Sequence, residues 1–318
     1  MPTERFLVTG GRGCIGAWAI RLLLDDGADV VLYDLGAADH RLELVVGDDL
    51  DRVQKLAGDV TSLENIERAL DEHEITNVLH LAALQVPFCK ANPPLGAAVN
   101  VLGTVNVFEA VKQRLDRIRR VVYASSAAVY GPARTSGTAP EEVLEWPSTH
   151  YGVYKIANEG NARIYWQDDR VPSIGLRPYV VYGPGRDQGV TSTPTVAMHA
   201  AAAGVPYNIS YGGRSQFHYA PDVARALIAA SRSDHEGALV ANVPSPTVHM
   251  QDVVDAINEA APGAAGSITF DDVQLPFPEE LEATALERAI GPVHVTPWRE
   301  GVRETIARFA NVPFTNAA

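Results

Sequence analysis

Tyr151 and Lys155, four residues apart, are the first candidates for chemistry in this sequence. They stand at the start of a predicted helix, where this spacing places both side chains on one face. A free tyrosine phenol has a pKa of about 10 and is a poor base at neutral pH. A lysine ammonium roughly 6 Å away would favour the phenolate by about 3 kcal/mol, or about two pKa units, at an effective dielectric near 20. The pair therefore suggests a tyrosine general base that a further positive charge must help to activate.

Two hydroxyls, those of Ser125 and Ser126, follow the predicted strand Arg120–Ala124. Ligands of open parallel sheets bind beyond the carboxyl ends of the strands, where a hydroxyl can orient a substrate hydroxyl or carbonyl. Each feature also has an ordinary structural explanation, a helix face for Tyr-x-x-x-Lys and a turn for paired serines. The catalytic interpretation depends on the two occurring together beside a cofactor site.

A glycine loop supplies that site. The segment Thr9–Gly16 reads TGGRGCIG, with Gly10, Gly13 and Gly16 between a predicted strand and a predicted helix. The first glycine permits a tight turn, the second lets the backbone approach a pyrophosphate, and the third allows close packing of helix and strand. The free N–H groups of the helix start suit phosphate. This arrangement predicts a dinucleotide site, and an oxidised nicotinamide ring would provide the second positive charge near Tyr151.

The choice of nucleotide depends on Asp34, which ends the second predicted strand 18 residues beyond Gly16. A carboxylate there accepts hydrogen bonds from the adenosine ribose and repels a 2′-phosphate, so the sequence favours NAD over NADP. Arg12 in the loop could reach a 2′-phosphate, although a pyrophosphate or surface contact explains it as well. Asp59 follows another strand and can contact the adenine edge, cap the next helix, or do both.

The elements that must position these residues alternate between strands and helices. Alternation of this kind predicts a Rossmann-type doubly wound parallel sheet with helices on both faces. We expect an NAD-binding domain over residues 1–180, with a segment near 215–245 returning to it, and a smaller, partly interleaved substrate lobe over 181–318. The predicted strands are 5–9, 29–33, 77–81, 120–124 and 172–176, and the predicted helices are 15–26, one after the capping box Thr61–Glu64, 95–114, 151–169, 221–231, 250–260 and 298–310.

Composition narrows the class of partner. The 318 residues carry 26 Lys and Arg against 39 Asp and Glu, a net charge of −13 that repels nucleic acid and anionic lipid. Two cysteines, Cys14 and Cys89, cannot form a disulfide framework and fit a reducing cytoplasm. We expect no membrane span, no signal peptide and no metal, because no Cys/His group has zinc spacing. The expected partner is a small-molecule substrate.

Together these motifs resemble the extended short-chain dehydrogenase/reductases, the NAD-dependent epimerase/dehydratase superfamily. The matching pieces are Thr9–Gly16, Asp59-Val60, His80–Ala83, Asn100–Thr104, Ser125–Gly131, Tyr151–Lys155, Arg177-Pro178 and Val181–Pro184. The resemblance implies NAD as cofactor, Ser126, Tyr151 and Lys155 as catalytic residues, and a homodimer through the helices near 95–114 and 151–169. It also implies a cofactor site formed by Gly10, Gly13, Cys14, Ile15, Gly16, Asp34, Asp59, Val60, Leu81, Ala82, Ala83, Asn100, Tyr151, Lys155, Pro178 and Val181.

One segment departs from the family pattern. Sugar-nucleotide epimerases usually carry an Arg on the substrate diphosphate, and here Arg214 stands one residue too early, with Ser215 and Gln216 in the adjoining positions. This shift favours a substrate without a diphosphate, such as a sugar, a sugar acid or another secondary alcohol, with Arg214 on a carboxylate. Gln85, Ser125 and Ser126 are the other predicted substrate contacts.

Three functions remain open. The first is an NAD(H)-dependent oxidoreductase in which Tyr151 takes a hydroxyl proton as hydride leaves the carbon. The second is a sugar or nucleotide-sugar epimerase/dehydratase that retains NAD and returns the hydride to the other face. The third is a dinucleotide sensor without catalysis, which would not require Ser126, Tyr151 and Lys155. Cofactor turnover and isomer formation distinguish the three.

Overall fold

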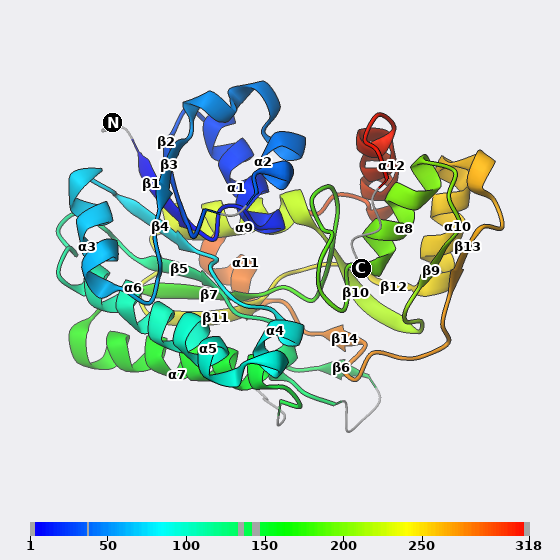
Figure 1. Ribbon diagram of the computed structural model, residues 1–318. Helices are drawn as coiled ribbons and strands as arrows, with labels where there is room; N and C mark the ends of the chain where they lie inside the picture. Colours follow the sequence, from blue (N-terminus) through cyan, green and yellow to red (C-terminus); the bar gives the residue numbers. More distant parts are fainter. Residues whose placement is uncertain (1–3, 37, 133–136, 142–146, 315–318) are drawn as a thin grey trace.

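The computed structural model describes residues 4–36, 38–132, 137–141 and 147–314 (Figure 1). Its centre is a parallel seven-stranded sheet in the order β11-β7-β5-β4-β1-β2-β3. The strands are β1 (Arg5–Thr9), β2 (Asp29–Asp34), β3 (Gln54–Ala57), β4 (Asn77–His80), β5 (Val121–Ala124), β7 (Ser173–Arg177) and β11 (Ala238–Asn242). This topology confirms the predicted Rossmann-type fold.

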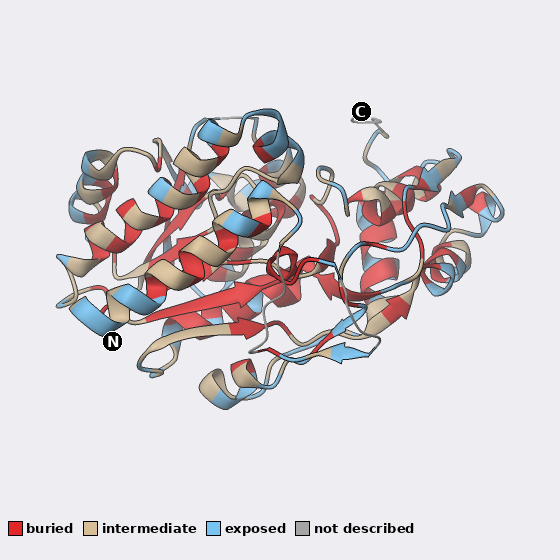
Figure 2. Cartoon of the chain, turned by 90° about the horizontal axis from the view of Figure 1, so that it is seen from below, coloured by how far each residue is buried: buried red, intermediate tan, exposed pale blue. Residues whose placement is uncertain are grey.

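Helices cover both faces of the sheet because neighbouring strand residues point to opposite sides. Phe6 and Val8 pack on one side with α1 (Cys14–Asp25), α2 (His40–Val45) and α9 (Ala220–Arg232). Leu7 packs on the other side, where α3 (Leu63–Glu72), α6 (Gly103–Lys112) and α7 (His150–Asp169) lie. Both faces are therefore apolar, and Figure 2 shows the buried sheet between the helices.

The predicted helix near 95–114 is built in three parts: α5 (Pro93–Ala97), the π-helical turn η2 (Ala98–Leu102), and α6. A short α4 (Val86–Ala91) precedes it. The 20 residues Pro93–Lys112 are long and apolar enough to cross a membrane, but 56% of the most apolar stretch is buried inside the fold. Packing of this helix against α3 and α7 explains its apolar composition.

The second part of the molecule has its own core beside the open end of the sheet. It contains β8 (Val180–Tyr182), α8 (Thr193–Ala202), β9 (Tyr207–Ile209), β10 (Arg214–Tyr219), β12 (Thr247–His249), α10 (Met250–Ala260), β13 (Ile268–Phe270) and α12 (Trp298–Phe309). Small elements complete the chain: η1 (Gly47–Arg52), η3 (Ala127–Val129), β6 (Thr138–Ala139), η4 (Pro262–Ala264), β14 (Glu280–Leu281) and α11 (Ala285–Ile290).

The chain crosses between the two parts more than once. β10 pairs with β8 and β12 in a three-stranded sheet of the second part. The next two elements return to the parallel sheet: α9 packs on its face, and β11 joins it as an edge strand. The cap predicted at Thr61 is wrong by one residue, because the hydroxyl of Ser62 accepts the N–H of Asn65 and caps α3. Asp59 instead accepts the N–H of Thr61 at 2.9 Å and holds the turn before that cap.

Candidate active site

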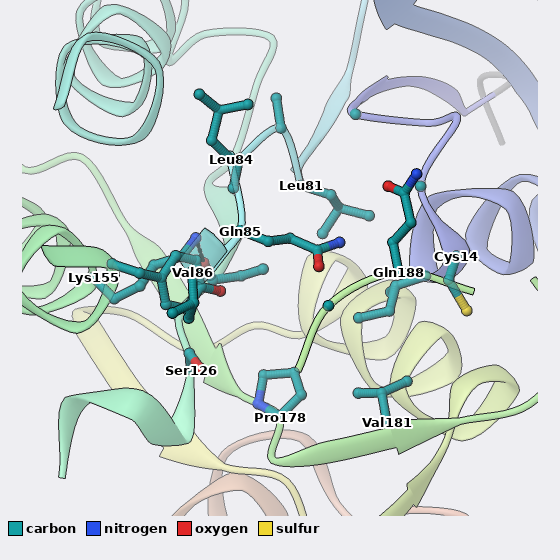
Figure 3. A pocket seen from close by; sticks show the side chains of 18 of the residues that line it. Cys14, Leu81, Leu84, Gln85, Val86, Ser126, Lys155, Pro178, Val181 and Gln188 are labelled. Atoms are coloured by element: carbon teal, nitrogen blue, oxygen red, sulfur yellow. Dashed lines mark hydrogen bonds between the residues drawn. The ribbon is translucent and has the colours of Figure 1, made fainter. Parts of the chain in front are cut away.

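A cavity of ≈ 680 Å³ opens at the carboxyl ends of β1, β4 and β5, between the parallel sheet and the second part (Figure 3). All the predicted site residues except Asn100 and Arg214 line it. The lining from the glycine loop and β2 includes Gly10, Gly13, Cys14, Ile15, Gly16 and Asp34. Later segments contribute Asp59, Val60, Leu81, Ala82, Ala83, Gln85, Ser125, Ser126, Tyr151, Lys155, Pro178 and Val181.

The glycine loop packs so closely against neighbouring backbone that side chains at two of its positions would clash. Gly10 has a φ of 68°, and a Cβ there would lie 2.6 Å from the backbone nitrogen of Ala82. A Cβ on Gly16 would lie 2.6 Å from the carbonyl oxygen of Gly10. Gly13 caps α1 without a side-chain bond to its N–H groups, so the helix start presents free donors. These residues fit the pyrophosphate of a dinucleotide.

The carboxylate of Asp34 is held at the rim of the loop. One oxygen accepts the N–H of Arg12 at 3.1 Å, and the other accepts the N–H of Leu35 at 2.8 Å. Both bonds come from backbone, so the carboxylate keeps lone pairs for ribose hydroxyls. Next to it, Tyr33 donates from its hydroxyl to the Asp59 carbonyl at 3.0 Å and ties the two strand ends together.

The end of β4 is held by Thr9 and His80. Their side chains meet at 2.8 Å, the other ring nitrogen of His80 lies 3.0 Å from the Thr104 hydroxyl, and Thr9 also accepts the N–H groups of Leu81 and Ala82. Burial lowers the pKa of His80 to about 3, so the ring is neutral and packs behind the cofactor region. His80 therefore holds the Thr9 hydroxyl that fixes the backbone of Leu81 and Ala82, which line the cavity.

Asn100 does not line the cavity, although the resemblance implied a cofactor contact. The side-chain oxygen of Asn100 accepts the backbone N–H of Leu84 at 2.8 Å, and its side-chain nitrogen donates to the Leu84 carbonyl at 3.0 Å. The backbone carbonyl of Asn100 accepts a hydrogen bond from the Asn158 side chain. The residue is buried in the π-helical turn. It therefore positions Leu84, which does line the cavity.

Ser126, Tyr151 and Lys155 come together at the cavity. Lys155 lies with its ammonium 5.4 Å from the centroid of the Tyr151 ring and donates to the Ala124 carbonyl at 2.6 Å. Burial raises the pKa of Tyr151, while a hydrogen bond with the Ser126 side chain and the charge of Arg186 lower it. Burial lowers the pKa of Lys155 to about 8. Without cofactor the phenol is therefore neutral at physiological pH, and the lysine alone does not ionise it.

Ser125 has a structural partner. Its hydroxyl donates to Glu159, whose carboxylate makes two hydrogen bonds of 2.8 and 2.7 Å to the guanidinium of Arg177. All three residues are buried. This paired charge anchors α7 to β7 directly behind Ser126 and Lys155, so the pair fixes the elements that carry the candidate chemistry.

The structure does not bring Arg214 to the cavity. It is the first residue of β10, the middle strand of the three-stranded sheet, where its side chain is 53% exposed and lies 3.7 Å from Glu279. The Gln274 side chain accepts the backbone N–H of Arg214 and donates to its backbone carbonyl. The predicted contact between Arg214 and a substrate carboxylate therefore has no geometric support.

Arg186 is a cavity-lining cation that was not predicted from the sequence. It follows the Gly183-Pro184-Gly185 turn and lines the cavity, with one guanidinium nitrogen 3.3 Å from the Thr191 hydroxyl. Its Nε is buried without a hydrogen-bond partner among the described residues. The only signal in the sequence was its place directly after the glycine and proline turn. Figure 3 shows Gln85 reaching across the cavity toward the segment that carries Gln188, in line with its contact to Gly189.

Burial keeps both cysteine thiols in the protonated form. Cys14 is buried at the start of α1, where burial raises the pKa of its thiol to about 12. Cys89 is buried against Leu84 and Asn100, and burial raises its pKa as well. Within the described ranges, no group of three or more His, Cys, Asp and Glu side chains is placed to hold a metal ion.

Comparison with known proteins agrees with this geometry. The model of the NAD-dependent epimerase/dehydratase family matches residues 6–243. A UDP-glucose 4-epimerase of Mycolicibacterium smegmatis is 30% identical over 71% of this chain and 72% of that protein. UDP-glucose 4-epimerase of Thermus thermophilus, solved in complex with NAD, superposes with a TM-score of 0.80 at 28% identity, over 98% of this chain and 100% of that one.

MoeE5, solved with UDP-glucuronic acid and NAD, superposes with a TM-score of 0.78 at 29% identity, over 96% of this chain and 98% of that one. The family match spans most of the chain and includes every motif from the glycine loop to β11. The resemblance drawn from the sequence is confirmed, and the cofactor is NAD. The chain belongs to the NAD-dependent epimerase/dehydratase family, and it is an NAD-dependent enzyme of the extended short-chain dehydrogenase type.

Proposed function

We propose that this enzyme moves a hydride between NAD and a secondary alcohol carbon of a sugar, a sugar acid or a similar small polyol. The observation that carries the proposal is the meeting of Ser126, Tyr151 and Lys155 at one wall of the cavity. A hydroxyl, a phenol and an ammonium at these distances can orient an alcohol and take its proton.

NAD supplies the hydride acceptor, and the glycine loop with Asp34 would hold its pyrophosphate and adenosine ribose. Ser126 orients the substrate hydroxyl by hydrogen bonding. Tyr151 accepts the proton of that hydroxyl at its phenolic oxygen. Lys155 keeps a positive charge beside the phenol and offers its ammonium to the nicotinamide ribose. Since burial raises the pKa of Tyr151, the base becomes effective only when the oxidised ring adds its positive charge.

Arg186 supports a substrate with a carboxylate. Its Nε is buried without a hydrogen-bond partner among the described residues. Leaving a buried guanidinium donor without a hydrogen bond costs folding free energy. A carboxylate matches the planar guanidinium with two parallel hydrogen bonds, as a phosphate also does. Arg186 also lies close enough to Tyr151 for its charge to lower the pKa of the phenol. We therefore propose a sugar acid held by Arg186, in place of the contact first expected from Arg214.

A nucleotide-sugar epimerase is the second candidate. UDP-glucose and UDP-glucuronic acid are ligands or substrates of enzymes 28 to 30% identical to this chain. Against it stands the absence of Arg214 from the cavity lining in a protein of net charge −13, which leaves Arg186 as the cation that would have to meet a diphosphate. A sensor without catalysis is the weakest of the three, because it would not need the Ser126–Tyr151–Lys155 arrangement.

A substrate panel distinguishes these candidates. NAD-loaded enzyme is incubated with sugars, sugar acids and nucleotide sugars while NADH absorbance and isomer formation are followed. The proposal expects net NADH with a sugar acid, and loss of at least tenfold in kcat/KM in Arg186→Gln. Formation of isomer without net NADH would identify an epimerase. The absence of both NADH and isomer would identify a sensor.

Calorimetric titration with UDP, UDP-glucose and dTDP-glucose tests the absence of a diphosphate site. Weak binding of all three is expected. Micromolar binding of any of them would overturn the small-substrate proposal and make the nucleotide-sugar epimerase the leading function.

We also propose a cytoplasmic homodimer. Exposed apolar side chains gather on the helices expected to form the interface, namely Leu95 of α5, Leu102 of η2, and Val153 and Ile164 of α7, each 45 to 48% exposed. A contiguous apolar patch marks an association surface, and these four side chains are the ones that would contribute to it.

A further inference from the structure

An ion cluster lies at the expected adenosine end of the cofactor site and is linked through Arg12 to the carboxylate of Asp34. Asp39, directly before α2, accepts the Nε–H of Arg12 at one oxygen and the ammonium of Lys55 at the other, both at 2.7 Å. Arg12 belongs to the glycine loop and Lys55 to β3. Three segments far apart in sequence therefore meet at one carboxylate.

This cluster is connected to Asp34. The backbone N–H of Arg12 donates to the Asp34 carboxylate, so the guanidinium that Asp39 holds starts from the same loop position. Arg12 lines the cavity, and its NH1 nitrogen is buried without a hydrogen-bond partner in the described part of the chain. A guanidinium with a spare donor, and an ammonium beside it, would ordinarily attract a phosphate.

We propose that Asp39 is a second dinucleotide-specificity residue, which holds Arg12 and Lys55 as an internal counterion and so withholds them from the 2′-phosphate of NADP. Asp34 repels that phosphate directly. Asp39 acts by occupying the cations that would compensate the repulsion.

Burial makes this withholding effective. The Arg12 and Asp39 side chains are only 12% and 22% exposed, so water compensates poorly when their ion pair is broken. Burial alone would raise the pKa of Asp39, but the hydrogen bonds from Lys55 and Arg12 lower it below the ordinary value. The carboxylate therefore stays charged throughout the neutral range.

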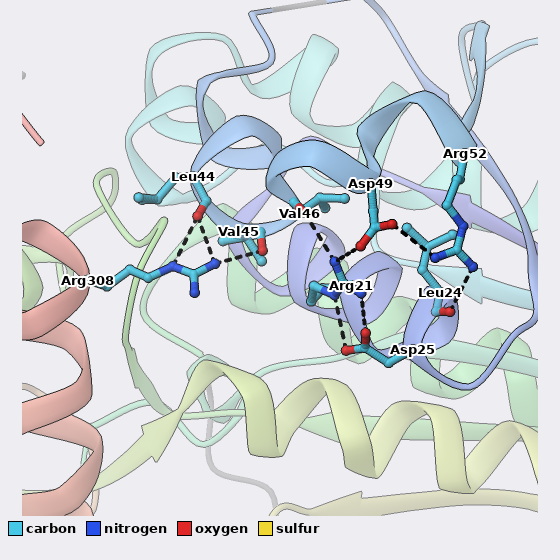
Figure 4. A network of polar contacts seen from close by, with 9 residues as sticks. All are labelled: Arg21, Leu24, Asp25, Leu44, Val45, Val46, Asp49, Arg52 and Arg308. Carbon is cyan, nitrogen blue, oxygen red and sulfur yellow. Dashed lines mark hydrogen bonds and ion pairs between the residues drawn. The ribbon is translucent and has the colours of Figure 1, made fainter. Parts of the chain in front are cut away.

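A second carboxylate held between two cations offers a matched control. Asp49 also accepts from two cations, Arg21 at 2.6 Å and Arg52 at 3.1 Å (Figure 4). Asp49 and its two partners do not line the cavity. Asp49→Asn removes the same charge from a similar cluster without touching the dinucleotide site.

The test is calorimetric titration of the apoenzyme with NAD and with NADP. Asp39→Asn is expected to bind NADP about tenfold more tightly than wild type, with NAD affinity within about twofold. Arg12→Gln added to Asp39→Asn should remove the gain, and Asp49→Asn should show none. The gain should also shrink as salt rises. Equal changes for both nucleotides, or no gain in a variant whose melting temperature matches wild type, would overturn the proposal.

A second variant keeps the proposal testable if Asp39→Asn folds poorly. Arg12→Gln alone should leave NADP affinity nearly unchanged relative to NAD, because Asp39 already neutralises the charge of the wild-type guanidinium. A selective tenfold loss of NADP affinity in this variant would mean that Arg12 is available to the phosphate, and would contradict the masking role of Asp39.

Discussion

Asp34 is the carboxylate placed to meet the adenosine ribose directly. It accepts two backbone N–H groups and keeps lone pairs for ribose hydroxyls. A 2′-phosphate would remove one hydroxyl partner and place like charges together. We predict at least tenfold tighter binding of NAD than NADP, about 1.4 kcal/mol, by titration of wild type. Asp34→Asn should narrow the ratio, and equal affinities in wild type would contradict the assignment.

Lys155 makes stability depend on pH. Burial lowers its pKa from 10.5 to about 8 in the folded protein, so the unfolded chain binds more protons between these values. The cost of burying the ammonium is fully present below about pH 8 and is relieved as pH rises toward 10.5. Relative to Lys155→Met, wild type should therefore gain about 2 kcal/mol in free energy of unfolding between about pH 7 and pH 9.5.

Denaturant titration of both proteins at the two pH values measures this difference. In Lys155→Met the Ala124 carbonyl loses its hydrogen-bond partner, which changes the free energy of unfolding by the same amount at every pH. The pH-dependent part of the difference between the two proteins is unaffected. A difference that is constant with pH would mean that Lys155 is not desolvated as the structure indicates. The same variant should bind NAD more weakly, because the ribose loses its ammonium contact.

At the scale of elements, the loop between β1 and α1 explains why the cofactor site forms. Gly16→Ala would force its Cβ to 2.6 Å from the Gly10 carbonyl and displace the loop. We predict a loss of NAD affinity of at least tenfold by calorimetry. Gly160→Ala is the control, since a Cβ on this α7 residue would meet nothing within 4 Å and should leave NAD binding unchanged. Equal NAD affinity in Gly16→Ala would show that the loop is not the pyrophosphate cradle.

The same scale separates what the sequence could predict from what it could not. The boundaries of β1, α7 and β7 differ from the predicted ones by at most one residue. β10 and β11 were not predicted as separate strands, because short runs reveal nothing about which sheet they join. Arg186 was missed and Arg214 was misplaced for a related reason: whether a single side chain reaches the cavity depends on tertiary packing.

Asn100 shows the corresponding limit for a family motif. The motif located it correctly beside the site, yet its amide is used entirely by Leu84 and Cys89. Motif spacing identified the segment, and only the fold distinguishes a residue that lines the cavity from one that supports it.

For the whole molecule, association should bury the apolar face formed by α5, η2 and α7. We predict a homodimer by light scattering coupled to size-exclusion chromatography. Leu102→Glu with Ile164→Glu should produce a monomer, because charges would enter the buried interface. Val273→Glu is the control, since Val273 is 60% exposed in the second part of the molecule. A wild-type monomer at micromolar concentration would contradict this surface assignment.

The central claim is that Tyr151 takes a proton from a substrate alcohol while hydride passes to NAD. A single-turnover experiment measures it directly, by mixing NAD-loaded enzyme with the sugar acid panel and following NADH absorbance. An enzyme that oxidises its substrate only transiently also gives a signal in this format. The account predicts NADH in wild type and a rate below about one hundredth of that in Tyr151→Phe, with NAD affinity retained. A Tyr151→Phe variant that reduces NAD at a rate close to wild type would contradict the account.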